Sequence, residues 1–128
     1  MMDKRTAYDI ISFQLNGHLV QTDLNAGERL SATLRDKMHS RDVKIGCDAG
    51  DCGACTVLID GAPVCACLTP AHQAQGRSVE TLSGLYLENQ HAKKLADSFQ
   101  YYGAAQCGIC TPGMMVSAVA LLNKNPTP

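Results

Sequence analysis

The segment GCDAGDCGAC, residues 46–55, decides how this chain folds, because three of its residues are cysteines and three are glycines. The spacing Cys47-x4-Cys52-x2-Cys55 is the one by which proteins ligate a 2Fe-2S cluster, with the fourth ligand supplied from farther along the chain. Amide N–H groups of such a loop should point at the sulfurs. The glycines that let its backbone approach a cluster closely are Gly46, Gly50 and Gly53. The segment therefore predicts an iron–sulfur protein that passes single electrons.

Two cysteines compete for the fourth ligand position. Cys65 and Cys67 lie two apart on a predicted strand, and we expect their side chains to face opposite sides, so that only one points at the loop. Spacing alone does not decide between them. The other would be a free cysteine that packs as a small hydrophobic side chain.

A zinc site is the main alternative for these thiols, because Cys-x2-Cys with further cysteines can hold tetrahedral zinc. A zinc knuckle needs only a compact turn, whereas a glycine-rich loop with three cysteines encloses a larger object. We therefore favour two irons, and we expect Asp48 and Asp51 of the loop to face solvent.

Length and composition limit the other functions. The 128 residues suffice for one domain or two small ones, and 5 % aromatic residues leave a small core, for which the seven cysteines are candidate cross-links. The N-terminus lacks the apolar stretch of a secretory signal, and no run approaches the ~18 apolar residues of a membrane span. We expect a soluble cytoplasmic protein, in which closely spaced cysteines bind metal. A net charge of −1 without basic runs gives no support to nucleic-acid or membrane binding.

Turn sequences typical of hairpins lie on both sides of residues 46–55, the cysteine loop. Asn16-Gly17 and Asp60-Gly61 are two-residue turn sequences between segments of strand-like pattern. The predicted strands are residues 9–16, 19–22, 56–59, 63–66 and 78–81. The second hairpin returns the chain beside the cysteine loop.

Helical spacing of apolar residues marks the remaining elements. The predicted helices are residues 29–39, 91–102 and 114–124. Thr111 would cap the last helix, with Pro112 at its first position. We place a domain boundary at Ser83-Gly84, where the periodicity changes.

Cys107-Gly108-Ile109-Cys110 is a second cysteine pair, placed immediately before the last helix. Amides and the dipole at a helix N-terminus favour thiolates there. The pair could be a redox-active dithiol or half of a metal site. We favour the metal site, because the chain already has a predicted iron–sulfur loop.

Together these motifs closely resemble the iron–sulfur subunit of molybdenum hydroxylases, the xanthine dehydrogenase and aldehyde oxidase family. The matching motifs are Gly46–Val57, Asp60-Gly61, Cys67–Ala71 and Gln106–Met114, and the resemblance runs from about Ile11 to Pro128. It implies an α+β chain. Residues 1–83 would form a β-grasp, plant-type 2Fe-2S ferredoxin domain, and residues 84–128 a helical domain, part of a four-helix bundle, for a second 2Fe-2S cluster.

The resemblance also assigns ligands. It implies that the first cluster is held by Cys47, Cys52, Cys55 and Cys67, which decides against Cys65. It implies that Cys107 and Cys110 are the first two ligands of the second cluster and that Gln106 contacts the molybdopterin cofactor. The family continues with two more helices and a Cys-x-Cys pair, whereas this sequence has no cysteine beyond Cys110. The remaining two ligands are absent, and we expect a truncated chain or one continued elsewhere.

The implied function is electron relay. The partners would be a molybdopterin-binding large subunit, where substrate is hydroxylated, and an FAD-binding medium subunit. This chain would be a subunit of an oxidoreductase with no catalytic residue and no substrate site of its own. The alternative is a free-standing 2Fe-2S ferredoxin that carries electrons by diffusion. With two helices of a four-helix unit, the apolar stripe of Met115, Val119 and Leu122 should be left uncovered within the chain.

Overall fold

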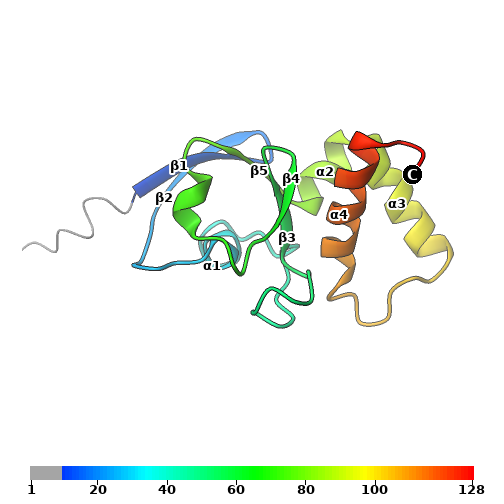
Figure 1. Cartoon of the computed structure of the whole chain (residues 1–128), viewed down its shortest axis with the longest axis horizontal. Helices are drawn as coiled ribbons and strands as arrows, with labels where there is room; N and C mark the ends of the chain where they lie inside the picture. The colour runs from blue at the N-terminus through cyan, green and yellow to red at the C-terminus, as the bar shows by residue number, and fades with distance from the viewer. Residues whose placement is uncertain (1–9) are drawn as a thin grey trace, which may run out of the picture.

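A five-stranded mixed sheet forms the N-terminal part of the molecule (Figure 1). The structure, a computed structural model, describes residues 10–128. The strands are β1 (Ile10–Leu15), β2 (His18–Asp23), β3 (Thr56–Ile59), β4 (Ala62–Cys65) and β5 (Ser78–Glu80). Their order is β2-β1-β5-β3-β4, with β1 parallel to β5 and all other neighbours antiparallel. Because β5 pairs with both β1 and β3, it joins the two hairpins into one sheet.

The hairpins form as the sequence predicts, and each predicted strand end lies within one residue of the observed end, except at residue 9, which lies outside the described residues. Asn16 and Gly17 adopt φ values of 51° and 84°, and Asp60 and Gly61 adopt 50° and 83°. The type I′ turn, whose backbone twist matches that of the two strands, requires positive φ at both central residues. Asn, Asp and Gly tolerate this conformation best. The second turn sets Thr56 opposite Cys65.

The predicted helix over residues 29–39 is only partly confirmed. It consists of α1 (Leu30–Ala32), which continues as a π-helical turn, η1 (Thr33–Lys37). The wide turn follows from hydrogen bonding, because the amide of Met38 donates to the carbonyl of Thr33, five residues back, at 3.0 Å. The Thr33 hydroxyl also contacts the carbonyl of Arg29 at 3.3 Å. A hydroxyl that bonds to the carbonyl four residues back in this way competes with the regular helical ladder.

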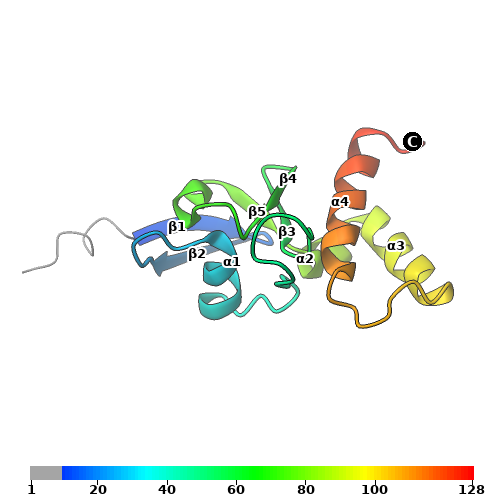
Figure 2. The same ribbon diagram turned by 60° about the horizontal axis from the view of Figure 1, so that its bottom comes forward.

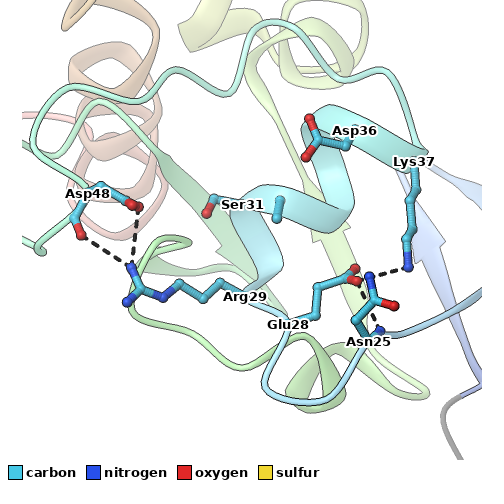
Figure 3. Close-up of a pocket in the computed structure, with 8 residues that line it drawn as sticks. Asn25, Glu28, Arg29, Ser31, Asp36, Lys37 and Asp48 are labelled. Carbon is cyan, nitrogen blue, oxygen red and sulfur yellow. Dashed lines mark hydrogen bonds and ion pairs between the residues drawn. The ribbon is translucent and has the colours of Figure 1, made fainter.

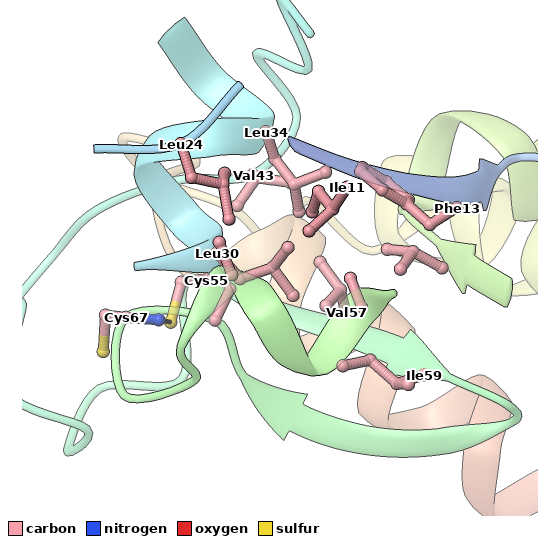
Figure 4. Close-up of a cluster of buried hydrophobic side chains, with 14 residues drawn as sticks. Ile11, Phe13, Leu24, Leu30, Leu34, Val43, Cys55, Val57, Ile59 and Cys67 are labelled. Atoms are coloured by element: carbon pink, nitrogen blue, oxygen red, sulfur yellow. Dashed lines mark hydrogen bonds between the residues drawn. The ribbon is translucent and has the colours of Figure 1, made fainter. Parts of the chain in front are cut away.

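The sheet and α1 enclose the first hydrophobic core (Figure 4). Phe13 of β1 and Leu30 and Leu34 of the helical segment are at most 1 % exposed. Val57 and Ile59 of β3 point into this core, together with Cys55 and Cys67. Two of the predicted metal ligands are therefore part of the packed interior.

Three helices follow the sheet: α2 (Leu82–Glu88), α3 (Gln90–Tyr101) and α4 (Thr111–Lys124). A short 3-10 turn, η2 (Ala71–Ala74), precedes β5. The sequence did not predict α2, which is seven residues long and contains Gly84, a poor helix former. Its first turn is capped from a distance, since the amide of Ser83 donates to Asp42 Oδ2 at 2.8 Å.

The ends of the two longer helices lie within three residues of the predicted ends. Asn89 Oδ1 caps α3 by accepting from the amides of His91 and Ala92 at 2.9 and 3.3 Å. The predicted N-cap of α4 is wrong by one residue, because Thr111 is already helical and Cys110 occupies the cap position without a side-chain hydrogen bond. The second predicted ligand pair thus ends directly at a helix N-terminus.

The prediction that the apolar stripe of α4 is left uncovered is wrong for Met115 and Val119, whereas Leu122 is only half-buried. Met115 and Val119 are 6 % and 0 % exposed. They are covered because α4 packs on β3 and on α2 and α3, where Leu58 and Leu85 meet it in a second core. Figure 2 shows α2, α3 and α4 grouped beyond the β3 side of the sheet. Leu58 can reach this core because adjacent strand residues face opposite sides.

Residues 10–128 are therefore of the α+β class, with a mixed sheet and the four α-helices α1 to α4. Among residues 10–128, no helix has the length and apolar character needed to cross a membrane.

Candidate metal centre in the cysteine loop

The loop between η1 and β3 is organised around sulfur atoms. Cys47 Sγ accepts hydrogen bonds from the amides of Ala49, Asp51 and Cys52 at 3.3, 3.2 and 3.3 Å. These amides, that of Cys52 first, lower the pKa of the Cys47 thiol from 9.0 to about 7. The side chains of Asp48 and Asp51 face solvent, as the sequence predicts. The backbone therefore favours a thiolate at Cys47.

Two more cysteine sulfurs accept backbone hydrogen bonds. Cys52 Sγ accepts from the amides of Cys47 and Ala54 at 3.3 and 3.4 Å. Cys55 Sγ accepts from the amide of Cys67 at 3.3 Å, a contact drawn in Figure 4. Cys47 and Cys52 are exposed, whereas Cys55 and Cys67 are 3 % and 2 % exposed. The four sulfurs thus run from the surface into the core.

The expectation that Cys65 and Cys67 face opposite sides of one strand is wrong. Residues two apart on a strand share a face, and β4 ends at Cys65, so Cys67 lies beyond it. Both thiols approach the loop at Gly50. Cys65 Sγ lies 3.9 Å from the carbonyl oxygen of Gly50, and the amide of Gly50 donates to the Cys67 thiol. Burial and the neighbouring Cys55 thiol raise the pKa of Cys67. Cys67, unlike the half-buried Cys65, adjoins Cys55.

At two of the three predicted loop glycines, Gly46 and Gly50, there is no room for a side chain. A Cβ at Gly46 would lie 2.7 Å from Cys52 Sγ, and one at Gly50 would overlap the side chain of Leu68. Gly53 meets no side chain closer than 3.6 Å, but its φ of 74° is one that glycine adopts readily. All three glycines keep the loop compact.

The residues present fit a 2Fe-2S cluster. Four cysteines come from one loop and the turn after β4, and backbone N–H donors aimed at thiolates are what an anionic cluster requires. Among residues 10–128, no three His, Cys, Asp or Glu side chains converge closely enough to hold a single metal ion.

Arg29, which no sequence pattern marks as functional, ties the loop to the start of α1. Arg29 donates from one guanidinium nitrogen to the carbonyl of Asp48 at 3.2 Å and to its carboxylate at 3.4 Å (Figure 3). Both side chains are more than half exposed, so the pair contributes at most about 1 kcal/mol. No local pattern marks this contact, because the two residues lie 19 positions apart.

Arg29 forms one wall of a cavity of about 420 Å³, and an ion pair forms another (Figure 3). Lys37 Nζ lies 2.8 Å from Glu28 Oε1, and the Glu28 side chain is 6 % exposed. Burial opposes ionisation of Glu28, but hydrogen bonds from Lys37, Thr33 and Asn25 outweigh it and leave its pKa below the usual value. The pair anchors the residues that lead into α1.

The second cysteine pair lies close to the first site. Cys107 and Cys110 are exposed, as is Gln106. Cys110 and Cys52 line the same cavity, of about 170 Å³, together with Gly53, Gly113, Met114 and Ser117. In Figure 2 the loop before α4 lies beside the cysteine loop. The fold therefore brings both predicted cysteine motifs together, although they are far apart in sequence.

Comparison with known proteins agrees with this chemistry. Residues 13–85 match the family model of the 2Fe-2S iron-sulfur cluster binding domain, and residues 81–128 match that of the [2Fe-2S] binding domain.

Individual relatives cover nearly all of the chain. The nicotine 6-hydroxylase small subunit of Paenarthrobacter nicotinovorans is 41 % identical over 92 % of this chain and 70 % of its own length. The nicotinate dehydrogenase small FeS subunit of Eubacterium barkeri is 42 % identical over 92 % of this chain and 74 % of its own. A chain in the crystal structure of quinoline 2-oxidoreductase from Pseudomonas putida 86 superimposes with a TM-score of 0.85, at 43 % identity, over 93 % of this chain and 73 % of that one. The chain belongs to the family of iron–sulfur small subunits of molybdenum hydroxylases.

Proposed function

We propose that this chain relays single electrons from a molybdopterin site in a large partner subunit to FAD in a medium subunit. The observation that carries the proposal is the set of backbone N–H groups directed at the sulfurs of Cys47, Cys52 and Cys55. A bound 2Fe-2S cluster supplies one-electron oxidation and reduction. The amides stabilise negative charge on the sulfurs and so tune the potential at which an electron is held.

The proposed ligands of the first cluster are Cys47, Cys52, Cys55 and Cys67. Cys67 is preferred to Cys65 because its thiol adjoins that of Cys55 and its amide donates to Cys55 Sγ. The loop is kept compact around the proposed cluster by Gly46, Gly50 and Gly53. Cys65, with its weak contact to Gly50, fills space beside the site.

For the C-terminal part, we propose that Cys107 and Cys110 are two of the four ligands of a second 2Fe-2S cluster. Their support is the exposed position at the start of α4 and the cavity shared with Cys52. The other two ligands would come from residues outside this sequence. Gln106, also exposed, is proposed to contact the molybdopterin of the large subunit.

The finer architecture follows the same proposal. Residues 1–83 form a β-grasp ferredoxin domain and residues 84–128 a helical domain that is part of a four-helix bundle. Support comes from the first core, which lies within the sheet part. The second core gathers α2, α3 and α4 on Leu58 of β3, and the proposed boundary falls inside α2 (Leu82–Glu88), so the two parts share an interface. We propose a cytoplasmic location for the assembled enzyme.

Purification from the native cells tests this function. The chain, tagged at its N-terminus, should elute with a molybdenum-containing large subunit and with FAD, and the complex should contain iron. Elution of the chain alone, with iron but without molybdenum, would instead support a diffusible ferredoxin. Zinc without a visible iron–sulfur absorption would contradict both.

A further inference from the structure

The third residue of α4 touches the cysteine loop through its backbone. A Cβ on Gly113 would overlap the carbonyl oxygen of Gly53 and would lie 2.9 Å from its carbonyl carbon and 3.1 Å from that of Ala54. Gly113 is buried, and these neighbours are backbone atoms, which cannot rotate away as a side chain can. The contact joins the helix that begins after Cys110 to the residue that follows Cys52.

The Gly53 carbonyl is held from its other side. It accepts hydrogen bonds from the amide of Thr56 at 3.1 Å and from the Thr56 hydroxyl at 2.7 Å. Thr56 itself is buried at the start of β3. The peptide that joins Gly53 to Ala54 is therefore fixed between the sheet and α4.

This same peptide bears a donor to a sulfur. Its N–H is that of Ala54, which lies 3.4 Å from Cys52 Sγ. A shift of the peptide away from α4 changes that contact directly. Hydrogen bonds to the sulfurs are one of the factors that set the potential of an iron–sulfur cluster.

We infer that Gly113 is a positioning residue: by allowing α4 to touch the Gly53–Ala54 peptide, it holds the Ala54 N–H on Cys52 Sγ and so sets the reduction potential of the first cluster. The inference rests on the proposed ligation of that cluster by Cys52. Through this contact, the position of α4, which begins directly after Cys110, affects the reduction potential of the cluster bound by Cys52.

Gly113→Ala tests the inference, because elsewhere in a helix this change would be favourable or neutral. The control is Gly84→Ala in α2, where an added Cβ would overlap the Asn16 side chain, far from the cysteine loop in sequence. Both variants add one methyl group to a crowded helical glycine. Only the first presses on the cysteine loop.

The readouts are the thermal midpoint of the full chain and the midpoint potential of its bound 2Fe-2S cluster, identified as the cluster whose signal is lost in Cys52→Ser. Gly113→Ala should lower the potential, with a change of about two- to tenfold in the equilibrium constant for reduction, the range for one weakened hydrogen bond. Gly84→Ala should lower the thermal midpoint and leave the potential unchanged. An unchanged potential in a folded Gly113→Ala protein would overturn the inference.

Thr56→Val is a second variant, in case Gly113→Ala does not fold. It removes only the hydroxyl bond to the Gly53 carbonyl, so the peptide loosens and the potential should fall, by less than in Gly113→Ala. If Gly113→Ala does not fold and Thr56→Val has the wild-type potential, the inference is wrong. A wild-type chain without an iron–sulfur spectrum would refute the proposed function itself, which separates the two failures.

Discussion

Leu58→Ala should uncouple the helices from the sheet. Leu58 lies on β3 and is 1 % exposed, and its side chain packs with Leu85, Val116 and Val119 rather than with the sheet's own core. The neighbouring strand residue, Val57, faces the opposite side and belongs to the first core. One strand therefore supports two cores through alternate residues.

The expected cost can be worked out from this burial. Leucine-to-alanine changes at buried sites cost about 2–5 kcal/mol, the lower values applying where the site can collapse. The Leu58 site is bounded by helices packed on a strand, so we expect about 3 kcal/mol. For a chain of this length, that corresponds to a fall of roughly 10 °C in the thermal midpoint.

Urea unfolding followed by circular dichroism measures the change, and hydrogen exchange locates it. Amides of α4 should exchange faster in Leu58→Ala, while those of β1 and β2 should change little. The control is Leu121→Ala on the outer side of α4, where 52 % exposure predicts a loss below about 0.5 kcal/mol. If Leu58→Ala and Leu121→Ala cost the same, the packing of α4 on the sheet is not as described.

Other expectations concern the cysteines. Cys67→Ser should abolish the first cluster's visible absorption, whereas Cys65→Ser should retain it; the opposite pattern would reassign the fourth ligand. In cluster-free protein, alkylation of Cys47 should reach half its maximal rate near pH 7, and a midpoint near 9 would show that the loop amides do not act on its sulfur. Since the folded pKa is the lower one, this group's contribution to stability is complete above pH 9 and is lost as pH falls through about 7. The small core that the composition indicates favours unfolding of the N-terminal part when the cluster is lost, but the first core consists mainly of residues outside the loop. We therefore expect that chelation of iron frees the amides of residues 46–54 to exchange while most strand signal in circular dichroism persists, and complete unfolding would contradict this.

The sequence predicted features that depend on neighbouring residues. The turns at Asn16-Gly17 and Asp60-Gly61 formed because their backbone requirement is local. The amides of the cysteine loop were expected to face sulfur, and three of them point at Cys47 Sγ. Such features need no knowledge of the rest of the fold.

Features that depend on distant contacts were missed. α2 is capped by Asp42, and Arg29 holds the cysteine loop from α1; neither partner lies nearby in sequence. The stripe of α4 was expected to be uncovered because the sequence indicates only two helices of a four-helix unit, whereas Leu58 of β3 and Leu85 of α2 pack against α4. The π-helical turn at Thr33 was also missed, because the spacing of apolar residues carries no sign of the bond from the Met38 amide to the Thr33 carbonyl.

Metal content of the purified chain, combined with paramagnetic resonance after one-electron reduction, tests the proposed iron–sulfur site most directly. Because the proposed ligands make one set of four thiolates and half of another, we expect about two irons and two inorganic sulfides per chain and a single 2Fe-2S signal, which Cys55→Ser removes. A chain that contains one zinc and no sulfide, or that keeps its signal in Cys55→Ser, does not hold the proposed cluster.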